Sequence, residues 1–428
     1  MNHFYKFLYN IFFIPFLWFG FYVAALFNPK IRRGIEGRKN LFVHLERSLA
    51  YSQNKGKRIW IHSSSLGEFE QAKPIIAQLK KNAPSLCVIA SFFSPSGFEN
   101  AKLDGLVDVK TYLPFDSTAN AKRFLEIVRP DVALFMSYDL WSNHIWQLRE
   151  NNIPIVVANV RLRMSFFLKR MYYRMMFSNV QYLFTVSDSE QENIRSLGIT
   201  NAVIETIGES RFDQVVQRAN EAKEKQLLAK NVIEGKQVFV IGSSWEEDER
   251  VFIPALFQLS TEHKNLLTIF VPHEPTEKTL IRIESQLSEK NSSIRFSQMK
   301  NYNNEQIILV DSIGVLLSLY QYADIAFVGG SFKEKVHNVL EPAVFGIPVL
   351  VGPKFQNSNE AIALQQLGGI ISVNDEQELF LTLKKIFTNE ILKNDIGRIC
   401  KAFVEQHRGA TEKIVKHVEE ILKLRIVD

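Results

Sequence analysis

The chain has 428 residues, of which 51 are basic and 46 acidic, so its formal net charge is +5. Hydrophobic residues make up 46% and charged residues 23%, which excludes wholesale disorder and predicts two or three folded domains with ample cores. The two cysteines, Cys87 and Cys400, exclude a disulfide framework and a multi-cysteine zinc site, and so small a net charge does not by itself indicate a nucleic-acid partner.

The first predicted element is an apolar helix near the start of the chain. Leu8–Phe27 carries no formal charge and matches the about 20 residues that a membrane-crossing helix needs. Basic residues gather behind it and only Lys6 stands before it, so the positive-inside rule places the remainder of the chain in the cytoplasm. A signal peptide fits less well, because no A-x-A-like site closes the run. We expect a membrane anchor over residues 1–29, or else a buried or interfacial helix, since Pro15 and Gly20 weaken the run.

Behind this segment, short apolar runs alternate with amphipathic stretches, which predicts parallel sheets built from βαβ units. The polar stretch Glu209–Lys225 interrupts this rhythm and marks a domain junction. The predicted fold class is therefore α/β, with two doubly wound Rossmann-like domains (30–212 and 213–404) facing a cleft. An amphipathic helix within 405–428, over Glu405–Leu424, is expected to pack back on the first domain. The predicted strands are Arg58–His62, Cys87–Phe92, Val107–Leu113, Asp131–Ser137, Ile153–Val160 and Tyr182–Ser187 in the first domain, and Gln237–Ser244, Leu266–Pro272, Gln306–Asp311, Asp324–Ser331 and Pro348–Gly352 in the second.

Several familiar site motifs do not occur in the sequence. It contains neither G-x-G-x-x-G nor G-x-x-x-x-G-K-[ST], and no G-x-S-x-G elbow. It also lacks H-E-x-x-H and an aspartate pair at D-x-D spacing. These absences weigh against hydride transfer, kinase chemistry and metal hydrolysis, and we predict neither a cofactor nor a metal site.

The first candidate site lies between a strand that ends near His62 and a helix that begins around Gly67. Glu68 would stand over the strand ends, where a carboxylate can take a proton from an attacking hydroxyl. The alternative is structural, because Ser65-x-x-Glu68 is also a capping box. His62 is expected to be a packed or hydrogen-bonded histidine.

Two further candidates lie in the second half. An apolar strand runs into Gly329-Gly330-Ser331, and Asn338 and Glu341 follow at a spacing that would place them on one helical face, where a carboxylate can accept both hydroxyls of a ribose. The alternative is a glycine-rich turn with a capped helix. Ser243-Ser244 could contact phosphate or sugar at the end of its strand, and could equally cap the next helix.

The fourth candidate is the basic stretch Arg161–Phe177, which has five basic and no acidic residues among aromatics and methionines. Such a helix suits an anionic membrane surface or a phosphorylated lipid. The alternative is a half-buried helix with a solvated basic edge.

A series of motifs runs in order along nearly the whole chain. Each motif is modest by itself, but the ordered set resembles the 3-deoxy-D-manno-octulosonate (Kdo) transferases that act on lipid A precursors. The segments that carry this resemblance are Trp60–His62 with Gly67–Glu68, Ser94–Gly97, Tyr112–Asp116, Arg129–Pro130, Leu140–Asn143, Ala158–Leu162, Asp311–Gly314, Phe327–Ser331, His337–Ala343 and Ile347–Leu350.

The resemblance implies a two-domain glycosyltransferase of the B type (GT-B), anchored at the inner membrane of a Gram-negative bacterium. Such enzymes move Kdo from CMP-Kdo to a glucosamine hydroxyl of the lipid A precursor (lipid IVA) in lipopolysaccharide core biosynthesis, with inversion and without a metal. The implied partners are CMP-Kdo, the lipid A precursor and the inner membrane surface, with no nucleic acid. The alternatives are another GT-B glycosyltransferase or a sugar-nucleotide epimerase, and a membrane-tethered binding protein with a degenerate site.

The resemblance also assigns roles to residues. It makes Glu68 the catalytic base, and it places Gly329–Ser331, Asn338, Glu341, Ser312 and Gly314 on the nucleotide-binding segment. Our hypothesis for the leaving group is that backbone amides around Gly330 and Ser331, aided by His273 or a lysine such as Lys354, balance the charge of its phosphate. The expected donor-binding residues are Ser243, Ser244, His273, Ser312, Gly314, Gly329, Gly330, Ser331, Asn338, Glu341 and Lys354. The expected acceptor-binding residues are Ser94, Ser96, Gly97, Asp139, Asn143 and Arg161.

Two segments depart from the family pattern. Where the family has M-E-T-E-L-W, this chain has Met136–Trp141, so Ser137 replaces the first carboxylate and Asp139 shortens the second. Where the family has P-R-H-P, His273 replaces the arginine. We expect these exchanges to alter acceptor and phosphate contacts.

Overall fold

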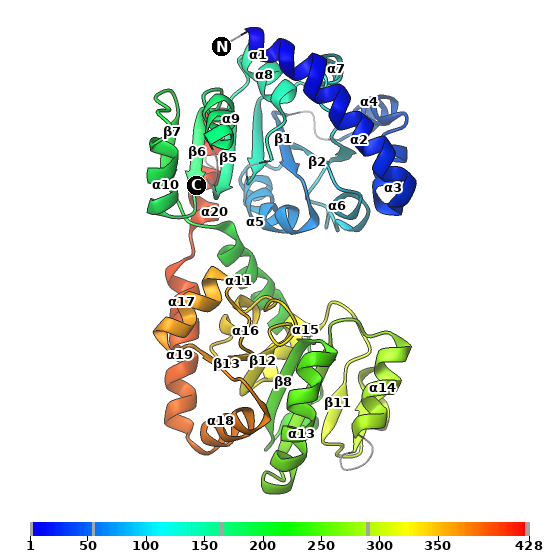
Figure 1. The fold of residues 1–428 in the computed structure, drawn as a ribbon, viewed down its shortest axis with the longest axis vertical. Coiled ribbons are helices and arrows are strands. Elements are labelled where there is room, and N and C mark those ends of the chain that lie inside the picture. Colours follow the sequence, from blue (N-terminus) through cyan, green and yellow to red (C-terminus); the bar gives the residue numbers. More distant parts are fainter. Residues whose placement is uncertain (1–2, 54–55, 138, 163–166, 288–291, 424–428) are drawn as a thin grey trace. The chain divides into compact units, whose positions relative to one another are not determined.

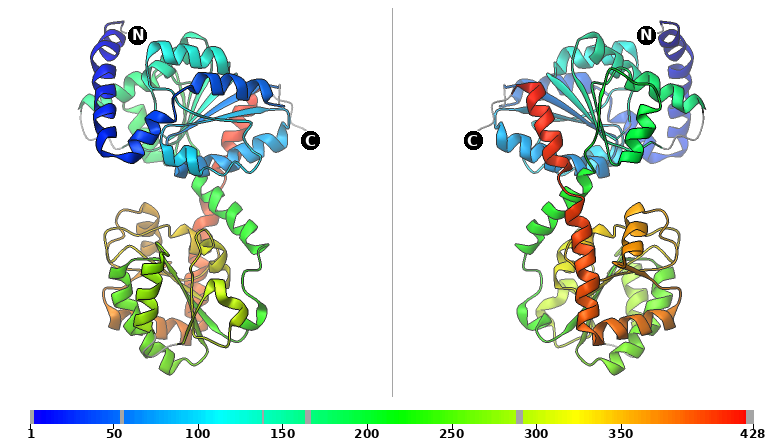
Figure 2. Two further views of the ribbon diagram at one scale, coloured as in Figure 1. Left: turned by 90° about the vertical axis from the view of Figure 1, so that its right-hand side faces the viewer. Right: turned by 90° about the vertical axis from the view of Figure 1, so that its left-hand side faces the viewer.

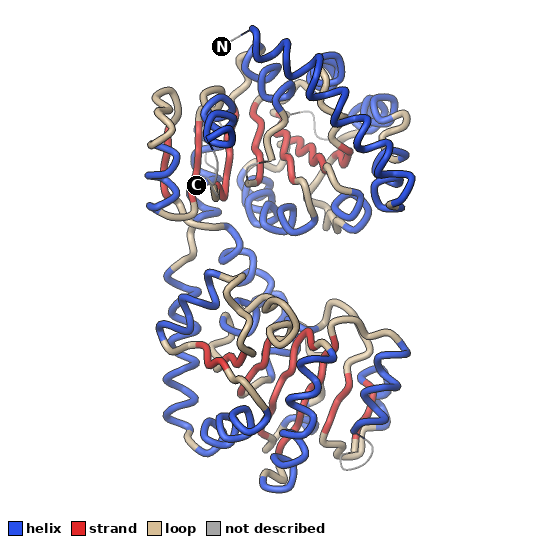
Figure 3. The backbone as a smooth tube through the Cα atoms, viewed as in Figure 1, coloured by secondary structure: helices blue, strands red, loops and turns tan. Residues whose placement is uncertain are grey.

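The structure is a computed structural model that describes residues 3–53, 56–137, 139–162, 167–287 and 292–423 (Figures 1 and 3). The chain divides into two compact units. The first domain is Met1–Gln214 with Arg408–Asp428, and the second domain is Val215–His407. This division and the predicted junction at 212/213 both lie within helix α11, Ser210–Lys223.

The first domain is built on a seven-stranded parallel sheet with the order β3-β2-β1-β4-β5-β6-β7. The strand order reverses at β1, as in a doubly wound fold. The strands are β1 Arg58–Ser63, β2 Cys87–Phe92, β3 Val109–Tyr112, β4 Val132–Met136, β5 Ile155–Val160, β6 Tyr182–Thr185 and β7 Val203–Thr206. The helices around it are α4 Leu41–Tyr51, α5 Leu66–Asn82, α6 Pro95–Asn100, α7 Thr118–Val128, α8 Ser142–Glu150, α9 Phe167–Phe177, α10 Asp188–Arg195 and α20 Ala410–Leu422.

Helices cover both faces of this sheet, so its central strands are buried throughout (Figure 2). Successive side chains of β1 point to opposite faces: Trp60 joins the core cluster formed with α4, α7 and α8, while Ile59 and Ile61 join the cluster formed with α5 and α20. Helix α20 adds Ile414 and Val418 to that second cluster. The continuous apolar runs of the sequence follow from this two-sided burial.

The apolar N-terminal segment is a single helical run, Phe4–Phe27, long and apolar enough to cross a membrane. It comprises α1 (His3–Leu8), a π-helical turn (Tyr9–Phe13) and α2 (Ile14–Phe27), and α3 (Pro29–Glu36) follows. One face packs on the first domain, where the Tyr9 hydroxyl donates to Asp116 Oδ2 over 2.8 Å. The other face exposes large apolar side chains: Phe4, Phe7, Ile11, Phe12, Phe16, Phe19, Val23, Leu26 and Phe27.

The second domain repeats the doubly wound plan, with the strand order β10-β11-β9-β8-β12-β13-β14 and parallel pairing throughout. Its strands are β8 Gln237–Ser244, β9 Leu266–Pro272, β10 Ser293–Arg295, β11 Ile307–Leu309, β12 Ile325–Val328, β13 Val349–Val351 and β14 Ile370–Ser372. Its helices are α12 Lys230–Ile233, α13 Glu246–Glu262, α14 Glu277–Leu287, α15 Leu316–Leu319, α16 Leu340–Ala343, α17 Asn359–Leu367, α18 Glu376–Thr388 and α19 Glu390–Gln406, with 3-10 turns at Phe296–Asn301 and Tyr320–Tyr322.

The predicted α/β class with two doubly wound domains is confirmed, but two predicted helices differ from the structure. The helix expected over Glu405–Leu424 is interrupted, because Gly409 adopts a φ of 105° between α19 and α20. The helical face expected to carry Asn338 and Glu341 does not form. Only Glu341 lies in α16, and Asn338 precedes that helix.

Candidate active site

The predicted site residues gather at one edge of each sheet. In a parallel sheet all strands end on the same side, so the loops after them lie along a shared edge. In the first domain, Glu68 follows β1, Ser94–Gly97 follow β2, Asp139 and Asn143 follow β4, and Arg161 follows β5. In the second domain the same edge carries the loops that follow its strands β8 (Ser243, Ser244), β9 (His273), β11 (Ser312, Gly314), β12 (Gly329–Ser331) and β13 (Lys354).

Glu68 is fixed through one of its two carboxylate oxygens. Its Oε2 accepts from the backbone N–H of Ser64 over 2.6 Å and of Ser65 over 3.2 Å, and Ser65 Oγ accepts from the Glu68 N–H in return. The predicted capping box is therefore present. Among the residues that the structure describes, Oε1 has no hydrogen-bond partner, so one oxygen orients the group and the other stays available.

The surroundings of Glu68 make its carboxylate more basic. Burial raises its pKa, and the negative charge of Asp139 raises it further, against the opposing effect of the Ser64 and Ser65 amides and His62. Asp139 itself accepts hydrogen bonds from the Ser64 hydroxyl and from Trp141 Nε1, the latter over 3.2 Å. The shortened acidic side chain at this position thus still lies near enough to the candidate base to raise its pKa.

His62 is a buried, hydrogen-bonded histidine, as predicted. Its Nε2 lies 3.4 Å from Asp139 Oδ2 and its Nδ1 lies 2.9 Å from Ser91 Oγ. Since a carboxylate only accepts, Nε2 carries a proton and donates to Asp139. Trp60 Nε1 donates to the same Ser91 hydroxyl over 2.7 Å, so the chain Trp60–Ser91–His62 supports Asp139 from the core.

The Ser94 loop lies directly against the Glu68 loop. The Ser94 N–H donates to the Ser64 carbonyl over 2.9 Å, and Ser94 Oγ caps α6 by accepting from the Gly97 N–H. A Cβ at Gly97 would lie 2.9 Å from Phe92 Cδ1 and 3.2 Å from the Ser65 carbonyl carbon. A residue without a side chain is needed for this approach, which brings the predicted acceptor loop beside the candidate base.

Two residues predicted to bind the acceptor have intramolecular partners. Asn143 is 2% exposed, and its amide bonds Asn10 of the N-terminal helix. The Arg161 guanidinium forms an ion pair with Glu209. The structure thus uses Asn143 to hold the N-terminal helix on the domain. Residues 163–166 of the basic stretch lie outside the described residues, and Phe167–Phe177 forms α9.

An apolar cavity of about 190 Å³ lies between the N-terminal helices and the Ser94 loop. Phe93, the residue before Ser94, lines this cavity, and its ring stacks on the ring of Trp141 with 4.6 Å between centroids. Lys30, an exposed basic residue, also lines the cavity. The other residues that line it are Phe21, Ile31, Gly34, Ile35, Arg38, Ser94, Pro95 and Phe115.

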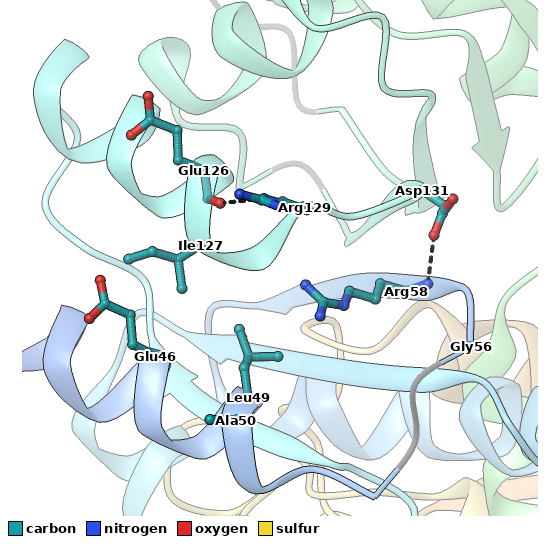
Figure 4. Close-up of a pocket in the computed structure, with 9 residues that line it drawn as sticks. All are labelled: Glu46, Leu49, Ala50, Gly56, Arg58, Glu126, Ile127, Arg129 and Asp131. Atoms are coloured by element: carbon teal, nitrogen blue, oxygen red, sulfur yellow. Dashed lines mark hydrogen bonds between the residues drawn. The ribbon is translucent and has the colours of Figure 1, made fainter.

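A larger cavity, of about 550 Å³, occupies the opposite edge of the first sheet (Figure 4). Arg58 at the start of β1 and Asp131 just before β4 line it, and the Arg58 N–H donates to Asp131 Oδ2 over 2.8 Å. Glu46 and Glu126 lie on its other side, on α4 and α7. Because it lies where strands begin, it brings together none of the predicted site residues.

In the second domain, the serine and glycine loops meet. A Cβ at Gly329 would lie 2.4 Å from the Ser243 carbonyl oxygen, and the His273 N–H donates to the Ser244 carbonyl over 2.9 Å. Ser243 adopts a φ of 56° at a bulge that ends β8. The predicted donor residues after β8, β9 and β12 are therefore neighbours.

The glycine turn is held by Asp248, a residue that no sequence motif indicated. This buried carboxylate accepts from the N–H groups of Gly330 over 2.7 Å, of Phe332 over 3.1 Å and of Trp245 over 2.9 Å. Burial raises its pKa, against the effect of these three amides. Ser331 is likewise engaged, since its Oγ accepts from the Gly352 N–H over 2.6 Å. The amide of Gly330 and the hydroxyl of Ser331, expected to hold a phosphate, thus have internal partners.

An aromatic stack beside this turn was not predicted from the sequence either. The His273 ring stacks on Trp245 and on His337, with 4.5 Å between centroids in each case. Trp245 Nε1 donates to His337 Nε2 over 3.0 Å, and Lys333 Nζ lies 3.5 Å from the Trp245 ring centroid. The sequence motifs gave neither residue a role of its own. His337 occurs in a motif only beside Asn338, and Trp245 follows the candidate serines Ser243 and Ser244.

Of the remaining predicted donor residues, Glu341 lies in α16, and Asn338, Ser312 and Gly314 lie in loops. Glu341 is largely buried, which raises its pKa, and Arg218 Nη1 lies 3.4 Å from its Oε1. Asn338 is exposed, and its Oδ1 accepts from the Leu340 N–H. Gly314 has a φ of 85°, a conformation that explains the glycine beside Ser312.

Comparison with known proteins identifies the relatives of the chain. Residues 41–214 match the model of a family described as 3-Deoxy-D-manno-octulosonic-acid transferase (kdotransferase). The 3-deoxy-D-manno-octulosonic acid transferase of Haemophilus influenzae is 27% identical over 379 residues, covering 86% of this chain and 88% of the relative. That of Chlamydophila psittaci is 28% identical over 372 residues, covering 83% and 82%.

Among solved structures, UDP-GlcNAc 2-epimerase from Neisseria meningitidis bound to UDP-GlcNAc has a similar fold. Its TM-score is 0.61 at 15% identity, over 85% of this chain and 100% of that chain. At this identity the likeness shows the fold alone, two α/β domains of the GT-B type. The sequence matches identify the chain as a glycosyltransferase related over most of its length to the Kdo transferases.

Proposed function

We propose that the chain transfers Kdo from CMP-Kdo to a glucosamine hydroxyl of the lipid A precursor, with inversion and without a metal or other cofactor. In this proposal the first domain binds the acceptor and the second binds the donor. The names of the relatives support Kdo as the sugar. The observation that carries the chemistry is the carboxylate of Glu68, oriented through Oε2 and available through Oε1.

The proposed reaction is a single displacement. Glu68 Oε1 takes the proton of the acceptor hydroxyl while that oxygen forms a bond to the anomeric carbon of Kdo. The bond between that carbon and the phosphate oxygen breaks, and CMP leaves with the bonding electron pair. The raised pKa of Glu68 supports this role, because a more basic carboxylate removes the proton more readily.

Asp139 should tune the pH dependence of this step. Since the base must be ionised, kcat/KM should fall as the pH drops through the pKa of Glu68. Asp139→Asn removes a negative charge that raises this pKa, so the acidic limb should move to lower pH. The measurement is kcat/KM against pH, with Asp395→Asn, an exposed change in the second domain, as the control. A limb that stays in place, or moves up, would contradict the coupling.

The apolar cavity beside the Ser94 loop supports a lipid acceptor. An acyl chain in it would lie next to a head group at Glu68, and Lys30 at its rim suits a lipid phosphate. Ile35→Trp should fill the cavity and raise KM for an acylated acceptor about tenfold, with a smaller effect on a deacylated one. Ile391→Trp, at an isoleucine that is 77% exposed, is the matched control. Equal effects on both acceptors would contradict this assignment.

We further propose that the apolar helix Phe4–Phe27 anchors the enzyme at the inner membrane, with both domains on the cytoplasmic side. The exposed apolar face of the helix and the basic residues after it support this location.

The deciding experiment is a transfer assay with the detergent-purified chain, CMP-Kdo and a tetraacylated disaccharide, read by product mass. We expect the acceptor to gain Kdo, and the mass to count the units added. Parallel reactions with UDP- and GDP-sugars test other donors, and release of free sugar or an epimer would indicate the epimerase alternative. Binding of CMP-Kdo without any transfer would indicate a binding protein.

A further inference from the structure

The proposed donor leaves as CMP, so the second domain needs a positive group for its phosphate. The groups that could supply the charge near the glycine turn are two histidines, His273 and His337, and three lysines, Lys333, Lys335 and Lys354. Their contacts differ enough to distinguish them.

The two histidines are poor candidates because their positions favour the neutral form. Burial lowers the pKa of His273, and it lowers the pKa of His337 to about 4. The hydrogen bond from Trp245 Nε1 also occupies the Nε2 lone pair of His337. At neutral pH both rings therefore stack without carrying a charge.

The turn itself offers few donors. The N–H groups of Gly330 and Phe332 both donate to Asp248. Lys354 is exposed, and its Nζ donates to the Lys333 carbonyl over 2.8 Å, which holds the main chain of the loop. Lys335 is exposed as well.

Lys333 is held in place without being neutralised. Its Nζ lies 3.5 Å from the centroid of the Trp245 ring, and it forms no ion pair with any residue that the structure describes. A contact with an aromatic face restrains an ammonium group but brings no counter-charge. Two other contacts hold Trp245 in place. Its ring stacks on His273, and its backbone N–H donates a hydrogen bond to Asp248.

We propose that Lys333, positioned by the Trp245 face, binds the phosphate of the cytidine monophosphate sugar and of the CMP that leaves. This inference rests on the proposed function. It makes Trp245 a positioning residue, since it acts by placing the ammonium group beside the loops after β8 and β12.

The test compares CMP with cytidine, which lacks the phosphate, in titration calorimetry with the full chain. Wild type should bind CMP more tightly than cytidine. Lys333→Met should weaken the affinity for CMP at least about tenfold, because a charge-assisted contact to the phosphate is lost. The affinity for cytidine should stay unchanged. Lys335→Met, the same change at an exposed lysine of the same loop, should keep the wild-type preference. Lys333→Arg, which keeps the charge, should retain most of the CMP affinity.

The outcomes separate this inference from the proposed function. A Lys333→Met protein that keeps the wild-type preference for CMP would overturn the role of Lys333 and leave the transferase proposal intact. A wild-type protein that binds UMP or GMP but not CMP would overturn the proposed donor. Loss of that binding in Lys333→Met would then still support Lys333 as the phosphate ligand. Wild-type binding that is equal for CMP and cytidine would overturn the inference outright.

Discussion

Replacing Glu68 by glutamine should lower kcat for transfer by about 10²–10⁴-fold while leaving the Kd for CMP-Kdo near its wild-type value. Glutamine has the same shape, and its carbonyl oxygen can still accept from the Ser64 and Ser65 amides that hold the carboxylate. It cannot take a proton from the acceptor hydroxyl. Only the chemical step should therefore be affected. The measurements are single-turnover transfer, read by product mass, and donor binding by calorimetry.

The control for this variant is Glu126→Gln, a neutralised glutamate at the opposite edge of the same sheet. It should transfer Kdo at the wild-type rate. Turnover retained in Glu68→Gln would refute the role of the carboxylate as base. A variant that loses donor binding as well as transfer would indicate that Glu68 acts through the structure of its loop.

The inner strands of both sheets could be predicted from the sequence, and so could one outermost strand, β3, which lies within the predicted Val107–Leu113; the other three outermost strands could not. Strands such as Cys87–Phe92 are buried at every residue, so they occur as continuous apolar runs. The strands β7, β10 and β14 lie at the edges of their sheets, and β10 and β14 are only three residues long. In β7, the first residue, Val203, is exposed. Strands this short, or exposed on one side, leave little signal in the sequence.

The location of the candidate site could be predicted, but the partners of its residues could not. The rule that loops after parallel strands share an edge placed Glu68 and the glycine turn correctly relative to their own sheets. Asp248, however, bonds Gly330 across 82 positions of sequence. The burial of Asn143 and the ion pair of Arg161 likewise depend on segments that the sequence pattern does not connect.

Asp248→Ala should cause a large loss of stability in the second domain. The carboxylate receives three backbone N–H groups, those of Trp245, Gly330 and Phe332, and alanine would leave them without this acceptor. A buried donor left unpaired costs about 1–3 kcal/mol. Gly330 is buried, whereas Trp245 and Phe332 are half-buried and lose less, so the free energy of unfolding of the second domain should fall by about 2–5 kcal/mol. Thermal and denaturant unfolding measure this effect.

The same substitution should reach the donor site, because Asp248 connects the helix start at Trp245 to the turn at Gly330. Below the unfolding temperature, Asp248→Ala should weaken CMP binding, since both the glycine turn and the aromatic face under Lys333 lose their common support. Glu246→Ala, an exposed change in the first turn of the same helix, should alter neither stability nor binding appreciably. If Asp248→Ala unfolded like wild type, the hydrogen bonds from the turn would be dispensable, and the proposed ordering of the phosphate site through Asp248 would have to be given up.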